Sequence, residues 1–227
     1  LVVTGINRFE LTPSLALVLG LQSINYRDTS DPRVNIDSSL VSNNAVFTDL
    51  LVNPSFSPNT YFSIAGRVDF EDSFDSETIW KFGARHDFDG GLYVRANGGT
   101  SFSLPKTNEL FFNSPTVVGN PDLKPERTET LNFGAGYIGD IAGRTLSIDV
   151  GGFHTDITNR IQTTTGLTPN TRFNNDAVTE IRGAVFDADY AFTRNIQASV
   201  SYTRQQARLA GSTRQINATP LWFATAN

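Results

Sequence analysis

Apolar and polar side chains alternate along most of this chain of 227 residues, and the alternation constrains the fold more than any other feature. In the first clear example, Leu15, Leu17, Leu19 and Leu21 fall on every second position. The pattern recurs at residues 62–70, 80–87, 92–99, 131–137, 146–151, 184–190 and 196–203, and less regularly at 216–226. A period of two predicts β-strands, because successive side chains of a strand point to opposite faces. We therefore expect an all-β protein with about nine or ten antiparallel strands.

The segments between the predicted strands are of two kinds. Short connections rich in Asp and Gly occupy residues 87–91, 139–143 and 193–195. Long polar connections span Asp28–Asn59, Leu104–Pro125 and Asn159–Asp176. Short and long connections alternate down the chain. An up-and-down meander with tight turns at one end and long loops at the other produces this order, which is typical of barrels in the bacterial outer membrane.

The alternation alone does not decide which face of the sheet is covered by protein. In a soluble sandwich the apolar face packs inward, whereas in a membrane barrel it meets lipid and the polar face lines the lumen. Strands of about ten residues or more favour the barrel, as do the small and charged residues on the polar faces. Aromatic residues at the ends of the apolar runs also favour it; these are Phe70, Phe102, Tyr137, Tyr190 and Tyr202.

The composition excludes several kinds of site. The chain has no cysteine, which excludes disulfides and metals bound by thiolates. Its formal net charge of -5 argues against a general phosphate-binding surface, so no nucleic-acid partner is expected. No apolar run reaches the roughly 18 residues that a transmembrane helix needs. Because the chain lacks methionine and begins at Leu1, we expect a processed chain or a piece of a longer protein.

A distinctive motif lies just before one alternating strand. It is the run Asn120, Pro121, Asp122, Leu123, Lys124, Pro125 and Glu126. The two prolines mark a loop that leads into a strand, because proline lacks the backbone donor of a central strand. The motif and the strand after it resemble the barrel of TonB-dependent outer-membrane receptors. Residues 96–105, 108–111 and 152–161 resemble neighbouring segments of that family, whereas Phe186 stands where the family commonly has Glu.

The resemblance implies a fold, a location and a function. The implied fold is an antiparallel up-and-down transmembrane β-barrel. Residues 1–227 resemble the C-terminal part of such a barrel, which has about 22 strands in this family. The resemblance therefore implies a partial barrel, without the plug domain and the terminal strands. The location is the bacterial outer membrane, with its lipid as a partner. The function is import of a scarce nutrient, of the ferric siderophore, haem or vitamin B12 (cobalamin) type. The TonB complex drives this import through the plug domain, and no enzymatic activity, metal or cofactor is implied.

Three aromatic residues on the long connections are candidate ligand contacts. They are Phe111 and Phe112 in the second long connection and Phe173 in the third. Binding residues are commonly presented on loops, and ligand sites are lined by hydrophobic and aromatic groups. We therefore expect these rings to contact the imported ligand.

Three other patterns suggest chemistry but have simpler interpretations. Gly134–Gly139 matches G-x-G-x-x-G, but it is followed by a turn and a strand rather than by a helix, so we expect lumen-facing glycines and a turn glycine. Asp87–Gly90 resembles the start of a calcium loop, but Gly98 stands where that loop needs Glu, so a hairpin turn is expected. His86 and His154 each lack a second histidine nearby and are expected to be polar residues at strand ends rather than ligands or bases.

Charged residues on the polar faces also allow two interpretations. Asp187 and Asp189 share one face, which favours lumen charge facing basic groups, with an acid pair or a cation site as the alternative. Three arginines on neighbouring strands, Arg67, Arg85 and Arg95, are expected to form a ladder with Asp69, Glu71 and Asp87. Guidance of an anionic ferric chelate is the alternative for these arginines.

The residues alone leave other classes of protein open. A soluble β-sandwich or an adhesin-like binding module has the same alternation. An outer-membrane barrel enzyme, such as a protease or lipase, needs a nucleophile or an acid pair at a rim, and the sequence offers no convincing one. A passive porin has the same barrel without a plug.

Overall fold

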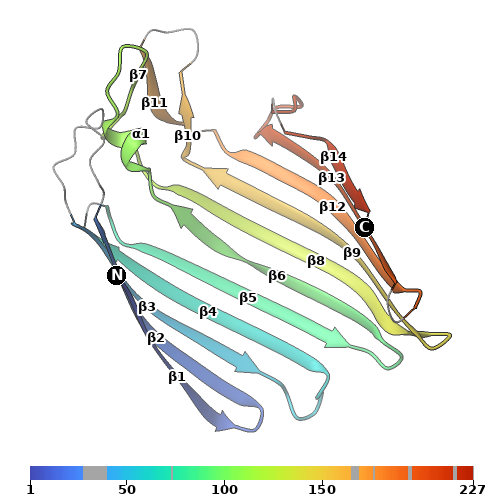
Figure 1. The fold of residues 1–227 in the computed structure, drawn as a ribbon. Helices are drawn as coiled ribbons and strands as arrows, with labels where there is room; N and C mark the ends of the chain where they lie inside the picture. The colour runs from blue at the N-terminus through green and yellow to red at the C-terminus, as the bar shows by residue number, and fades with distance from the viewer. Residues whose placement is uncertain are drawn as a thin grey trace.

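The computed structural model describes residues 1–27, 40–72, 74–164, 169–175, 177–193, 196–216 and 219–226. Eleven antiparallel strands form one large curved sheet (Figure 1). In spatial order they are β1 (Val2–Thr12), β2 (Leu15–Arg27), β3 (Leu40–Val52), β4 (Thr60–Glu71), β5 (Glu77–Asp87), β6 (Leu92–Ser103), β8 (Glu126–Ile141), β9 (Arg144–Thr158), β12 (Thr179–Ala191), β13 (Gln197–Leu209) and β14 (Trp222–Ala226). No helix in these ranges is long and apolar enough to cross a membrane.

Neighbouring strands of the large sheet follow one another along the chain, except that β7 (Val117–Val118) lies between β6 and β8, and β10 (Arg160–Thr163) and β11 (Asn170–Asn175) lie between β9 and β12. A small second sheet contains only β10, β11 and β7, and the helix α1 is Thr107–Phe111. The predicted all-β, antiparallel, up-and-down arrangement is therefore confirmed. The sheet has eleven strands rather than nine or ten, because β1 and β3 were not predicted.

The prediction that Asp28–Asn59 is one long loop was wrong. The strand β3 runs through it, residues 28–39 lie outside the described part, and a turn at the other end of β3 completes the segment. The alternation of β3 is obscured because Phe47 points to the otherwise polar face. Phe47 has room there because its neighbour on β2 is Gly20, where any side chain would overlap the Phe47 ring.

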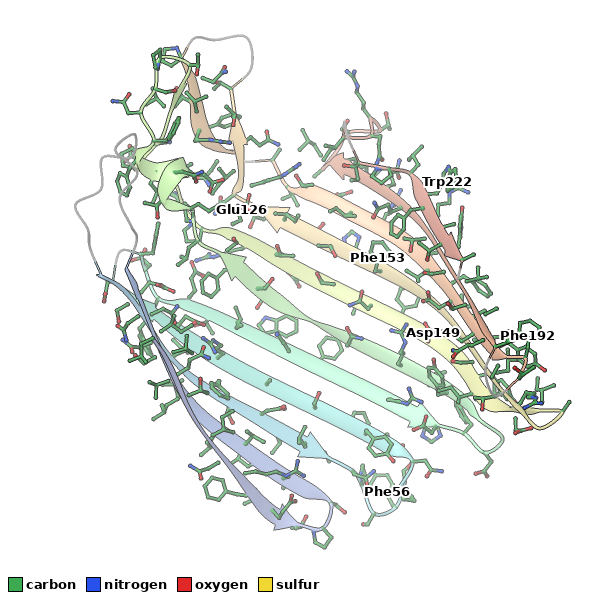
Figure 2. All side chains as sticks on the ribbon, in the orientation of Figure 1. Phe56, Glu126, Asp149, Phe153, Phe192 and Trp222 are labelled. Atoms are coloured by element: carbon green, nitrogen blue, oxygen red, sulfur yellow. The ribbon has the colours of Figure 1, made fainter. Side chains whose placement is uncertain are left out.

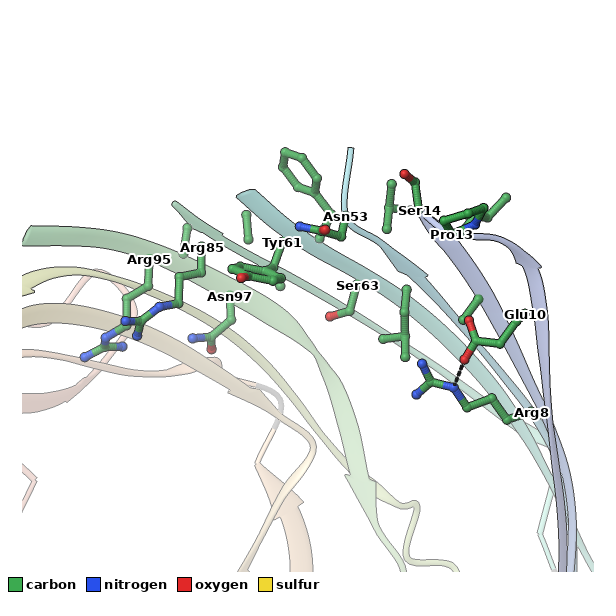
Figure 3. A pocket seen from close by; sticks show the side chains of 18 residues that line it. Arg8, Glu10, Pro13, Ser14, Asn53, Tyr61, Ser63, Arg85, Arg95 and Asn97 are labelled. Carbon is green, nitrogen blue, oxygen red and sulfur yellow. Dashed lines mark hydrogen bonds and ion pairs between the residues drawn. The ribbon is translucent and has the colours of Figure 1, made fainter. Parts of the chain in front are cut away.

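The apolar face of the large sheet is exposed, and no second sheet formed by the described residues covers it. Ile64 is 61% exposed, Phe133 60% and Val150 52%. A soluble protein rarely exposes such a continuous apolar surface, so a sandwich does not fit and the face suits lipid. The opposite, concave face carries polar and charged side chains, as Figure 3 shows for Arg85, Arg95 and Asn97.

The two ends of the sheet differ as the sequence predicted, except that only residues 72–76 join β4 to β5 at the end with the long loops. At one end, tight turns have backbone in the left-handed region at Gly90, Gly91, Ala142 and Gly143. This confirms the hairpin at residues 87–91, although Gly139 lies inside β8 rather than in a turn. The predicted turn at 193–195 lies partly outside the described residues. Exposed phenylalanines occupy three connections at this end, where an aromatic girdle would lie. They are Phe88 and, labelled in Figure 2, Phe56 and Phe192.

Candidate functional site: a braced pair of loops above a polar wall

Two of the predicted long connections, Leu104–Pro125 and the described part of Asn159–Asp176, lie together at the other end of the sheet (Figure 1). The first contains α1 and β7, and the second contains β10 and β11. β10 and β11 form a short antiparallel hairpin, and β11 pairs in parallel with β7. We call residues 104–125, 159–164 and 169–175 the loop platform. The parallel pairing of β7 with β11 joins two loops that are about fifty residues apart in sequence.

The side chain of Asn174 connects the two loops. Its Oδ1 accepts a hydrogen bond from the Lys124 backbone N–H (2.8 Å), and its Nδ2 donates to the Lys124 carbonyl (3.0 Å). The same Nδ2 also donates to the carbonyl of Asn159 (2.8 Å). One amide side chain therefore serves three backbone groups that have no strand partner.

The motif that includes Lys124 makes further contacts to the second loop. Asn120 Nδ2 donates to the Arg172 carbonyl (3.1 Å), and Glu126 accepts a hydrogen bond from the Ile161 N–H (2.5 Å). Leu123 is only 3% exposed, and it is the one large aliphatic side chain among the buried hydrophobic residues of the described chain. The motif that suggested the family thus acts here as a brace between two loops.

The other half of the first loop is held by backbone contacts. The N–H of Gly119 donates to the Phe112 carbonyl (2.6 Å), and the N–H of Asn120 donates to the Glu109 carbonyl (2.8 Å). A Cβ at Gly119 would lie 2.6 Å from the carbonyl of Leu110, so this close approach requires glycine. These contacts fix the position of α1 against the motif.

The three predicted ligand contacts lie on the loop platform. Phe111 is 42% exposed at the end of α1, and Phe173 is 36% exposed on β11. Phe112 is half-buried. The brace brings the two loops together, but the aromatic pairs found among the described residues do not include these three rings. Their role in ligand binding stays a prediction.

Below the platform, charged groups of the concave face interact across strands. Arg95 on β6 reaches over β8 to Asp149 on β9, with Nη2 to Oδ1 at 2.5 Å and Nε to Oδ2 at 3.1 Å. The hydroxyl of Tyr93 donates to the same carboxylate at 2.6 Å. The intervening positions on β8 are Gly134 and Gly136, and a Cβ at Gly134 would lie 3.2 Å from the Arg95 guanidinium. The first two glycines of the G-x-G-x-x-G run, Gly134 and Gly136, therefore leave room for side chains of β6 to pass over β8 and reach β9.

The predicted arginine ladder is correct in two places and wrong in a third. Arg67 pairs with Asp69 (2.7 Å), and Arg85 pairs with Asp87 (2.6 Å) while lying 3.9 Å over the Tyr93 ring. Arg95 pairs with Asp149, which the sequence did not suggest. The missing signal was the pair of glycines on β8, since only small residues let a side chain span an intervening strand.

Glu71 also departs from the predicted ladder, because its carboxylate accepts a hydrogen bond from Asn43. Asp187 lies opposite Asp149 and Asp189 lies opposite Ser147 on β9. The described residues contain no group of three or more metal-ligating side chains, so the cation-site alternative for the two aspartates gains no support.

The two histidines have ordinary polar neighbours. His86 Nδ1 lies 2.7 Å from the Thr60 hydroxyl, and its ring packs edge-on against Phe88. His154 Nε2 lies 3.3 Å from Asp156. His86 lies next to the end of β5 as expected, whereas His154 lies inside β9 rather than at its end.

The concave face near the short turns forms an open hollow of about 520 Å³ (Figure 3). Side chains from β1 to β6 line it, among them Arg8, Glu10, Tyr61, Ser63 and Asn97. Arg8 and Glu10 form an exposed ion pair at 2.7 Å. A concave surface of mixed charge and amide groups is suited to contact with water or with another polar protein surface.

Comparison with known proteins gives a consistent result. Residues 4–227 match the family described as "TonB dependent receptor-like, beta-barrel". The chain is 35% identical over 95 residues to the vitamin B12 transporter BtuB of Vibrio vulnificus, a match that covers 42% of this chain and 14% of the transporter. It is 30% identical over 128 residues to BtuB of Photobacterium profundum, covering 56% of this chain and 20% of that protein.

Solved structures also share the fold. The siderophore receptor PirA of Pseudomonas aeruginosa superposes with a TM-score of 0.77 at 15% identity, and the match covers 91% of this chain. It covers 40% of the PirA chain. The present chain therefore spans less than half the length of each of these proteins.

Proposed function

Because the chain belongs to the TonB dependent receptor-like β-barrel family, whose barrels lie in the bacterial outer membrane, we propose that it forms wall and loops of a receptor that imports a scarce, large nutrient. TonB supplies the energy for this import through a plug domain inside the barrel. The role is transport and not catalysis, in keeping with relatives that are named as transporters.

One observation supports the proposal more than any other. A single curved sheet exposes apolar side chains on one face and polar side chains on the other, and a braced pair of loops lies at one end of it. The first face suits lipid and the second suits a hydrated lumen. The loops offer a preorganised surface, which reduces the entropy lost when a ligand binds.

The imported ligand belongs to the ferric siderophore, haem or cobalamin classes. Of these, the similarity to two vitamin B12 transporters favours a cobalamin-like ligand. Such a ligand is large and has both polar and apolar groups. The exposed rings of Phe111 and Phe173, together with Phe112, are the proposed apolar contacts.

Binding by the purified full-length receptor tests the ligand class and the contacts together. Cyanocobalamin, haemin and a ferric catecholate are titrated separately, and we expect tight binding of one of them. The double variant Phe111→Ala/Phe112→Ala should weaken that binding at least tenfold. The matched control is Phe88→Ala/Phe192→Ala, which removes two exposed rings at the opposite end of the sheet and should leave the affinity unchanged. Equal affinities in the wild type and the loop variant would reject these contacts.

Uptake measurements separate the proposal from a passive porin. Cells that express the full-length receptor should accumulate the ligand only when TonB is present. Uptake that persists in cells without TonB would contradict the proposal and favour passive diffusion through the barrel.

A further inference from the structure

The strands β5 and β6 separate toward the loop platform (Figure 1). Their ladder runs from Asp87–Tyr93 to Lys81–Gly99 and stops there. Both strands continue beyond this point, because β5 stays paired with β4 as far as Glu77 and β6 stays paired with β8 as far as Ser103. At the point of separation, the N–H of Trp80 donates to the Thr100 hydroxyl (3.1 Å) in place of a ladder bond.

An ion pair spans the separated strands. Arg127 on β8 reaches past β6 to Glu77 on β5, with Nη2 to Oε1 at 2.9 Å and Nε to Oε2 at 3.0 Å. Glu77 is only 5% exposed, so this bidentate contact compensates a buried carboxylate. The contact neutralises Glu77 and holds the two sides of the gap at a fixed separation.

The gap is a hollow of about 440 Å³, which we call the notch. Its lining is rich in hydroxyl groups and carboxylates and includes one aromatic ring: Ser76, Glu77, Thr78, Ile79, Thr100, Ser101, Phe102, Arg127, Thr128, Glu129, Asp156 and Thr158. By alternation, Thr100 and Phe102 share the outward face of β6 with Leu92 and Val94, which are both exposed. The notch therefore opens on the outside of the wall, close to the loop platform.

The chemistry of the lining selects a class of ligand. Glu129 and Asp156 lie directly opposite each other on β8 and β9, and Arg127 is already paired, so an anionic group is repelled. A bound metal ion is not supported, because the described residues contain no cluster of metal-ligating side chains. Hydroxyl donors would stabilise the two facing carboxylates and would also satisfy strand backbone groups that lack a ladder partner.

We propose that the notch binds a neutral saccharide. Its hydroxyl groups would donate to Glu129 and Asp156 and exchange hydrogen bonds with the threonine and serine hydroxyls, and an apolar ring face would lie on Phe102. The saccharide comes from one of two sources, the head group of a glycolipid in the surrounding membrane or a free sugar. This site does not depend on which nutrient the receptor imports.

Native mass spectrometry of the full-length receptor, purified in a detergent without sugar, tests the site. Three probes are added separately: a monoglucosyl diacylglycerol, the same diacylglycerol without glucose, and free maltose. The wild type should retain the glucosyl lipid at least fivefold more than the plain lipid. The double variant Glu129→Gln/Asp156→Asn and the separate variant Phe102→Ala should each lose most of this preference. Gln206 is an outward polar residue on β13, at the same end of the sheet as the notch. The control variant Gln206→Ala should keep the preference for the glucosyl lipid.

The outcomes separate the sources and the alternatives. Retention of the glucosyl lipid alone identifies a membrane glycolipid, and retention of maltose as well shows that the sugar suffices. Equal retention of the two lipids would overturn the proposal, and so would variants that bind like the wild type. Heat-modifiable migration in gels confirms that each variant forms a folded barrel, and Phe102→Ala tests the site without any change in charge.

Discussion

The eleven-stranded sheet, which we call the wall, and the loop platform are stabilised in different ways. In the wall, each position has many equivalents, because every strand repeats the same apolar and polar faces and the same ladder of backbone hydrogen bonds. In the platform, single side chains make contacts that nothing else replaces. Asn174 serves three backbone groups, and Leu123 is the one large aliphatic residue that is buried in the described chain.

This difference predicts where a substitution is tolerated. A wall position tolerates changes that respect its face, since lipid or water accepts many side chains. A platform position tolerates few changes, since its neighbours were placed for one side chain. The following predictions compare matched substitutions in the two regions.

The largest difference is expected between Leu123→Ala and Leu131→Ala. Truncation of buried Leu123 should destabilise the platform by about 2–5 kcal/mol, because it removes packed methyl groups and leaves a cavity. Leu131 faces outward on β8 and is 47% exposed, so the same truncation should cost only about 1 kcal/mol. Hydrogen exchange of residues 117–126 in the full-length receptor measures the first effect, and urea unfolding in vesicles measures the second. Equal costs would remove the distinction between the two regions.

A second comparison tests the alternation within the wall. Asn132 and Phe133 are neighbours on β8 with side chains on opposite faces. Phe133→Arg places a charge toward lipid and should destabilise the barrel by about 2–4 kcal/mol, whereas Asn132→Arg places it toward the lumen and should have little effect. Urea unfolding of the full-length receptor in phospholipid vesicles measures both. If the two variants unfold alike, the apolar face does not meet lipid.

The alternation explains why most of the wall could be predicted from the sequence. It failed for β1 and β3, where single residues break the pattern: Asn7 lies among apolar neighbours of the outward face, and Phe47 lies on the inward face. Such exceptions depend on contacts between strands, such as the space that Gly20 provides for Phe47. A pattern read along one strand cannot contain that information.

The third prediction concerns the brace itself. Asn174→Ala removes three hydrogen bonds and leaves backbone groups of Lys124 and Asn159 without these partners, which should destabilise the platform by about 2–3 kcal/mol. Asn113→Ala, an exposed residue of the first loop, is the matched control and should change little. Faster hydrogen exchange in both loops of the Asn174 variant is the expected result. Faster exchange in only one loop would show that the loops are not braced together.

The brace also shows what the sequence could and could not provide at the candidate site. The motif at 120–126 indicated the family and the position of a loop, because its prolines and its order of residues are distinctive. Asn174 has no local signal, since its partner Lys124 is fifty positions away. The chemistry of an isolated Asn does not reveal which backbone it will meet, so long-range brace residues were missed while motif residues were found.

The smallest loss of stability is expected at the ion pair of Arg95 and Asp149, where the wall, like the platform, uses specific side-chain contacts. Arg95→Gln removes two hydrogen bonds to Asp149, but Tyr93 still donates to that carboxylate, so the cost should be about 1–2 kcal/mol. Lys81→Gln is the control, since Lys81 also faces inward and has no ion pair within the described ranges. Urea unfolding of the full-length receptor in vesicles compares the two variants. A larger cost for Arg95→Gln would show that the wall has its own specific contacts wherever glycines on an intervening strand let charged groups meet, and equal costs would show that the concave face tolerates changes as the lipid face does.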